Sequence, residues 1–264
     1  NVAIGDSAAP AMTIGKYNTA VGYEALLSED VGDTTVAIGY QALANQNSDS
    51  DNETTGNTAV GYAVGLEQTT GTNNTYLGYI AGRYNQTGAN NTYLGFQAGY
   101  GASGQSNSGN TGVGYQSLLA ITDGGYNTTV GLSSGTALTT GDQNVFIGSS
   151  AGHGTQDVDY AVCIGNNAAI ENMTSAADGT IAIGYSALRN LTSGPGNLAV
   201  GFSALIACTT GIGNVAIGSG SLATEDTGDF NTAVGTNALG KQNVDGTTGN
   251  TALGYKAGAA FTSS

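Results

Sequence analysis

Few residues of the chain carry side chains that act as acids, bases or nucleophiles. The only histidine, His153, stands between Gly152 and Gly154, and no serine or cysteine motif places it in a catalytic triad. The two cysteines, Cys163 and Cys208, form neither a CxxC pair nor a zinc-binding pattern with histidine. Catalysis needs several such groups held together. We therefore expect that the protein is not an enzyme and that it uses no cofactor.

Charge excludes two further classes of partner. The chain has 19 acidic and 5 basic residues, which gives a net charge of −14. This charge repels nucleic-acid phosphates and anionic membrane surfaces, so we expect no nucleic-acid partner. No run of 18 apolar residues occurs, so we expect no membrane insertion. The basic residues are too scattered for a polysaccharide-lyase site: Lys16, Arg83, Arg189, Lys241 and Lys256.

Acidic turns are the best candidates for a metal site. Calcium prefers several oxygen ligands from such stretches. However, the sequence contains neither the EF-hand pattern nor the glycine-rich calcium-binding repeat. Solvated charges that keep the protein soluble are the interpretation that we favour. The calcium candidates are Asp49, Asp51 and Glu53 in one turn, and Glu225, Asp226 and Asp229 in another.

An internal repeat must position all of these residues. The chain of 264 residues has 44 Gly and 2 Pro, and an aliphatic residue followed by glycine recurs fifteen times. Most intervals between motif glycines, such as the one from Gly5 to Gly22, are 17 residues long, and the few longer ones carry short insertions. Glycine does not recur at every third position as in a strict Gly-X-Y repeat, which excludes collagen. The motif glycines are Gly5, Gly22, Gly39, Gly61, Gly78, Gly95, Gly114, Gly131, Gly148, Gly165, Gly184, Gly201, Gly218, Gly235 and Gly254.

An aliphatic residue precedes every motif glycine. A slot that is aliphatic in all fifteen copies predicts one buried side chain per repeat. Two positions before the glycine stands a small residue in most copies, usually Ala, which would let another chain approach closely. An aromatic residue often follows the glycine, and we expect its ring to pack against the same ring one repeat away. The predicted core is Ile4, Val21, Ile38, Val60, Leu77, Leu94, Val113, Val130, Ile147, Ile164, Ile183, Val200, Ile217, Val234 and Leu253.

Asparagine stands four positions before most motif glycines. Stacked Asn side chains bond to one another and to neighbouring backbone at a turn. A further glycine, in the second half of most regular repeats, is expected to supply a left-handed turn. The Asn column comprises Asn18, Asn57, Asn74, Asn91, Asn110, Asn127, Asn144, Asn197, Asn214, Asn231 and Asn250.

These features predict an all-β fold. At about 3.3 Å per residue, 17 residues trace about 56 Å, enough for two short strands and two tight turns. A 17-residue repeat is too short for a helical hairpin. Each repeat is therefore one coil of a parallel β-solenoid (β-roll) of about fifteen coils, and we expect residues 1–264 to form a single repeat domain. The longer intervals lengthen a turn and leave the strands unchanged.

Four segments carry a resemblance to known proteins. NTAVGYEAL (18–26), TVAIGYQAL (35–43), NTAVGYAVG (57–65) and NVAIGSGSL (214–222) resemble the YadA-like head repeats of trimeric autotransporter adhesins and the repeats of phage-type tail fibres. The resemblance spans all fifteen repeats. It implies a left-handed roll, three chains about a threefold axis, and a role as the stalk or head of a surface fibre. Two features depart from the adhesin pattern: the repeat is longer than the usual adhesin coil, and Thr replaces Val in eight copies.

The expected function is structural. We expect an extracellular, cell-surface or virion fibre module, homotrimeric, that displays variable turns to a cell-surface glycan or protein receptor. Because solenoid ends leave strand edges unpaired, we also expect the chain to be a segment of a longer fibre or to stack into filaments. The alternative is a solenoid that binds glycan or ice through one repeated face. A face of identical surface residues along the coils would favour this alternative.

Overall fold

The computed structural model describes residues 1–51 and 53–262. It is an all-β parallel β-solenoid of about fifteen coils, as the repeat predicted. The coils divide into two compact units, Asn1–Asn127 and Thr128–Ser264. Each unit is built from the same repeat.

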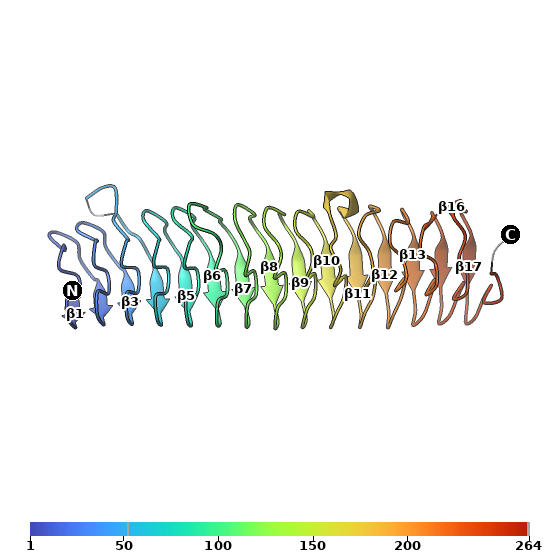
Figure 1. Ribbon diagram of the computed structural model, residues 1–264, viewed down its shortest axis with the longest axis horizontal. Coiled ribbons are helices and arrows are strands. Elements are labelled where there is room, and N and C mark those ends of the chain that lie inside the picture. Colours follow the sequence, from blue (N-terminus) through green and yellow to red (C-terminus); the bar gives the residue numbers. More distant parts are fainter. Residues whose placement is uncertain (52, 263–264) are drawn as a thin grey trace. The chain divides into compact units, whose positions relative to one another are not determined.

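In the first unit, every coil contributes one strand of three residues. Successive strands pair in parallel and in chain order, as the coloured arrows of Figure 1 show. The strands are β1 (Val2–Ile4), β2 (Thr19–Val21), β3 (Val36–Ile38), β4 (Thr58–Val60), β5 (Thr75–Leu77), β6 (Thr92–Leu94) and β7 (Thr111–Val113).

The second unit continues this pattern and adds a short 3-10 helix and a second, two-stranded ladder. The elements are β8 (Thr128–Val130), β9 (Val145–Ile147), β10 (Val162–Ile164), η1 (Ser175–Ala177), β11 (Ile181–Ile183), β12 (Leu198–Val200), β13 (Val215–Ile217), β14 (Gly228–Asp229), β15 (Thr232–Val234), β16 (Gly246–Thr247) and β17 (Thr251–Leu253). Strands β14 and β16 pair with each other, and the other strands pair in chain order. The prediction of two strands in each coil is therefore wrong for most coils.

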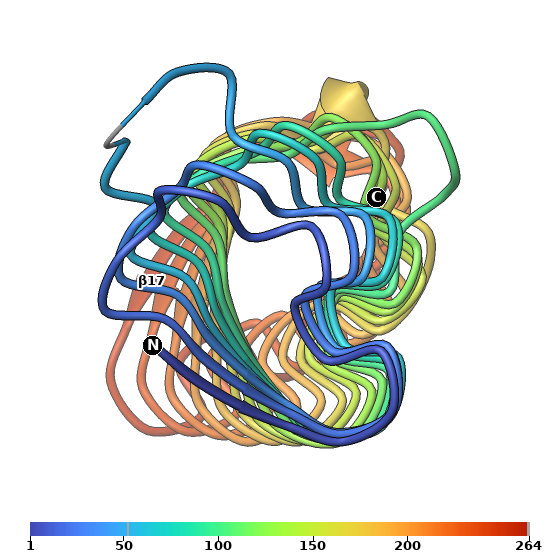
Figure 2. The ribbon, with the colours of Figure 1, turned by 90° about the vertical axis from the view of Figure 1, so that its left-hand side faces the viewer.

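Strand register follows the repeat, even where a repeat is longer. Ala20 pairs with Ala37 across a repeat of regular length, and Ala37 pairs with Ala59 across the longest repeat of the chain. The extra residues lie in turns, as predicted. In Figure 2, the green turn at residues 101–108 and the gold helix η1 lie outside the path of their neighbouring coils.

Close stacking of backbones explains the motif glycine. A Cβ on Gly148 would lie 2.5 Å from the carbonyl oxygen of Gly165 in the next coil, and the φ of Gly148 is 132°. No side chain fits there. The turn glycines have the same steric cause, because a Cβ on Gly15 would lie 2.5 Å from the carbonyl oxygen of Gly32. Gly15 is not among the residues with positive φ, so the predicted left-handed role is wrong at this position.

The middle residue is buried in the interior in every three-residue strand except β1. Ala20, Ala199 and Phe146 are completely buried, as are the corner residues Leu26 and Leu205. The aliphatic residue before the motif glycine points the other way, because successive side chains of a strand alternate between faces.

The predicted core is therefore wrong as a set. In the isolated chain, each of these aliphatic residues is half-buried or exposed, and Ile4, Leu77 and Leu253 are among the exposed ones. The small residue two positions before the glycine was expected to let a second chain approach. It faces the interior of its own coil instead. The residues wrongly predicted to form the core are Ile4, Val21, Ile38, Val60, Leu77, Leu94, Val113, Val130, Ile147, Ile164, Ile183, Val200, Ile217, Val234 and Leu253.

The Asn column forms the predicted ladder inside the turn. Asn214 Nδ2 donates to the carbonyl oxygen of Gly228 at 2.8 Å, and Asn214 Oδ1 accepts the backbone N–H of Asn231 at 2.9 Å. Nδ2 also lies 3.2 Å from Oδ1 of Asn197. Asn214 thereby satisfies backbone groups of the next coil that the turn would otherwise leave unpaired.

Candidate functional site

The chemistry-bearing residues lie apart in the structure. His153 occupies an exposed position in a corner of its coil. Cys163 and Cys208 are free and completely buried, and burial raises the pKa of both thiols, that of Cys208 to about 12. A buried thiol that stays protonated is a poor nucleophile.

The acidic candidates for calcium do not converge. Among residues 1–51 and 53–262, no three His, Cys, Asp or Glu side chains are placed to hold a metal ion. Asp49 and Asp51 are exposed, and Glu53 Oε2 accepts the N–H of Asp49 at 3.3 Å. In the second turn, Asp229 Oδ1 accepts the N–H of Ile212 at 2.9 Å.

Glu225, one of the three calcium candidates in the second acidic stretch, is buried inside the solenoid. Its Oε1 accepts the N–H of Gly228 at 2.8 Å, and its Oε2 accepts Nε2 of Gln242 at 2.9 Å. Glu29 repeats this arrangement in the first unit, with Gln46 Nε2 at 2.9 Å. Both Glu residues are therefore structural, and each Gln stands one regular repeat after its Glu. That spacing is the sequence signal that would have identified the pairs.

The outer face of the strands forms a regular surface in each unit. We define this outer strand face as the first and third side chains of the three-residue strands of that unit. All of these residues are Thr, Val, Ile or Leu, and none is buried in the chain. Exposed contiguous apolar surface of this kind marks an interaction site.

A ladder of aromatic rings borders this face in the first unit. The rings follow the motif glycines of consecutive coils and stack with centroids 4.9–5.2 Å apart, as predicted. Each ring is 40–48% exposed, but the neighbouring rings occupy the faces of the inner members. The ladder therefore presents ring edges and hydroxyl groups to solvent. Its members are Tyr23, Tyr40, Tyr62, Tyr79, Phe96 and Tyr115.

Four other aromatic residues stand one position before the Asn slot of the repeat, and their backbone is in the left-handed conformation. Tyr17, Tyr126, Tyr160 and Phe230 are 54–75% exposed, with φ of 58–62°. Phe230 packs beside Gly213 of the preceding coil, where a Cβ would lie 2.8 Å from the ring. Along the sequence, at least two repeats separate each of these rings from the next, so they do not form a continuous ladder.

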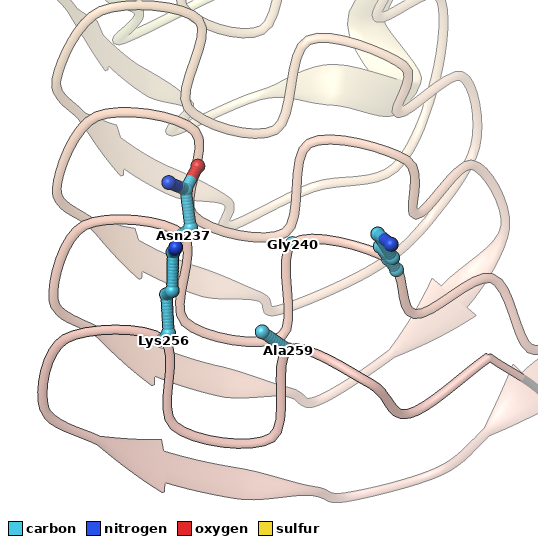
Figure 3. A pocket seen from close by; sticks show the side chains of 5 residues that line it. Asn237, Gly240, Lys256 and Ala259 are labelled. Atoms are coloured by element: carbon cyan, nitrogen blue, oxygen red, sulfur yellow. The ribbon is translucent and has the colours of Figure 1, made fainter.

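A shallow cavity of about 290 Å³ lies in the second unit (Figure 3). Asn237 and Lys256 lie one above the other along one wall, and Lys241 also lines the cavity. Lys256 Nζ lies 5.1 Å from the ring centre of Tyr255. Both lysines are exposed, so the cavity attracts anions but holds its charged groups in no fixed geometry.

Comparison with family models, curated proteins and solved structures finds no match to this chain. Within the described part of the chain, no helix is long and apolar enough to cross a membrane.

Proposed function

We propose that the chain is a structural module of an extracellular or virion fibre, and that it associates with further copies of itself through the outer strand face. The resemblance of its repeats to YadA-like heads and phage-type tail fibres supports a homotrimer. The turns between strands vary in sequence and length, which suits the display of contacts to a surface glycan or protein receptor.

One observation carries this proposal. The outward strand positions hold no charged residue in any of the fifteen coils, although the chain carries a net charge of −14. Most acidic residues lie in the turns instead, so two copies repel each other there. The outer strand face is a surface on which a second copy approaches without burying an unpaired charge.

The spacing of the coils favours a copy of the same chain. Parallel strands repeat at about 4.8 Å, so the aliphatic side chains of the face recur at that interval. Another coil stack with the same spacing meets every one of them in register. An unrelated globular surface matches only a few.

Sedimentation velocity at micromolar concentration tests this proposal. We expect the wild-type chain to sediment as a trimer. The double variant Leu77→Asp/Ile147→Asp places one charge on the outer strand face of each unit and should sediment as a monomer with an unchanged circular dichroism spectrum. Asn45→Asp/Thr140→Asp adds the same charge at exposed turn positions and should remain trimeric. A monomeric wild type, or equal dissociation of both variants, would overturn the proposal.

A further inference from the structure

Three successive coils of the first unit carry unusual residues in one corner. The fifth and sixth positions after the motif glycine are both small or aliphatic in about half of the coils, but here they include Glu67, Arg83, Tyr84 and Tyr100. Backbone bonds hold these coils side by side: Glu67 N–H donates to Arg83 O at 2.9 Å, and Tyr84 N–H donates to Tyr100 O at 3.2 Å. We call these four residues, with Ser103, the Arg83 cluster.

The two tyrosines form a perpendicular pair. Their ring centroids lie 4.8 Å apart at an interplanar angle of 82°, and Tyr100 OH donates to Tyr84 OH at 3.3 Å. This hydrogen bond is the main cause that raises the pKa of the Tyr100 hydroxyl. Both rings are half-buried. Unlike the stacked ladder, a perpendicular pair cannot cover all of its own ring faces.

Arg83 brings one unused hydrogen-bond donor, its Nε, to this pair. The centre of its guanidinium lies 5.4 Å from the ring centre of Tyr84. Its Nε is buried, and no acceptor among the described residues lies within hydrogen-bond distance of it. A buried N–H without an acceptor is costly, and an oxygen atom of a bound molecule would remove that cost.

Glu67 of the preceding coil supplies an acceptor to the cluster. Its Oε2 accepts Ser103 Oγ at 2.9 Å, across 36 residues of sequence. Ser103 belongs to the lengthened turn at residues 101–108, which projects in green in Figure 2. This bond therefore ties the turn to the cluster.

We propose that the Arg83 cluster is a binding site for a neutral sugar residue of an oligosaccharide. A pyranose ring presents an apolar C–H face, which packs on a tyrosine ring, and hydroxyl groups that both donate and accept. Arg83 donates to one hydroxyl and Glu67 accepts from another. Arg83 and Glu67 together carry no net charge, whereas an acidic ligand would meet Glu67 and the chain's charge of −14. This site is discrete and does not depend on self-association.

An array of neutral and acidic glycans tests the proposal, followed by titration of the strongest ligand. We expect the wild-type protein to retain neutral glycans, and Arg83→Gln and Tyr84→Ala to weaken binding about tenfold or more. Arg189→Gln is the matched control, because Arg189 is exposed at the same repeat position, and no ring contact or hydrogen bond of its side chain occurs in the described chain. If Arg83→Gln proves misfolded by circular dichroism, Glu67→Gln serves in its place.

Three outcomes would overturn this site: no retained neutral glycan, retention of acidic glycans only, or an equal loss of binding in Arg189→Gln. A ligand that proves to be a peptide would also contradict it. The monomeric variant Leu77→Asp/Ile147→Asp should still bind the same glycan in single-site titration. Its behaviour therefore separates failure of the sugar site from failure of self-association.

Discussion

The ring of Phe146 occupies the space in which any larger residue at position 152 would place its side chain. A Cβ on Gly152 would lie 2.7 Å from Cδ2 and Cε2 of that ring. Tyr93 and Gly99 show the same relationship. Where the middle strand residue is Ala, as at Ala199, the corner carries Leu in six of nine coils, as at Leu205. Strand and corner therefore share one volume inside these coils.

This shared volume predicts a compensating pair of substitutions. Phe146→Ala should lower the free energy of unfolding by about 3–5 kcal/mol, because it leaves a cavity. Gly152→Leu should also be destabilising, because its side chain meets the Phe146 ring. The double variant recreates the Ala–Leu pair of other coils, so it should lose less stability than either single variant. Denaturant unfolding measures all three, and additive losses would contradict the shared volume.

The sequence predicts the fold better than it predicts the direction of each side chain. A regular period and turns that absorb insertions were enough to infer the solenoid. In Thr19-Ala20-Val21, however, both alternating faces are free of charge, so the pattern alone does not show which face is inside. The corner residues that fill the interior decide it, and they become neighbours of the strand only once the path of the coil is known.

The candidate sites show the same limit. Glu225 stands in an acidic turn, and its inward direction depends on the coil path. Arg83 and Tyr100 are one repeat apart, and their shared corner was visible in the period. The free Nε of Arg83 and the perpendicular rings depend on side-chain conformations that the repeat does not specify.

The Asn ladder predicts a cost at a single amide. Asn214→Ala removes the partners of Gly228 O and Asn231 N–H, which are buried between coils. Two unpaired backbone groups should lower the free energy of unfolding by about 2–4 kcal/mol. Asn166→Ala, at an exposed corner position, should cost less than about 0.5 kcal/mol. Thermal unfolding compares the two, and equal shifts would argue against a stabilising ladder.

The buried thiols predict a loss of stability in alkali. Unfolded thiols ionise near the ordinary pKa of 9.0, whereas Cys208 in the folded chain does so only at about 12, and the pKa of Cys163 is raised further. The folded pKa lies above the unfolded one, so this stability is fully present below about pH 9 and is lost as the pH rises from there. The free energy of unfolding should fall by about 1.4 kcal/mol for each thiol at about pH 10.

Urea unfolding between about pH 7 and pH 10 measures this loss. Cys208→Val removes one of the two thiols and should reduce the alkaline loss by about half, whatever its effect at neutral pH. The wild-type thiols should also resist an aromatic disulfide reagent until urea unfolds the chain, because both are completely buried. A urea midpoint that stays constant up to about pH 10, or rapid reaction of the native thiols, would show that Cys163 and Cys208 are accessible and ionise as free thiols do.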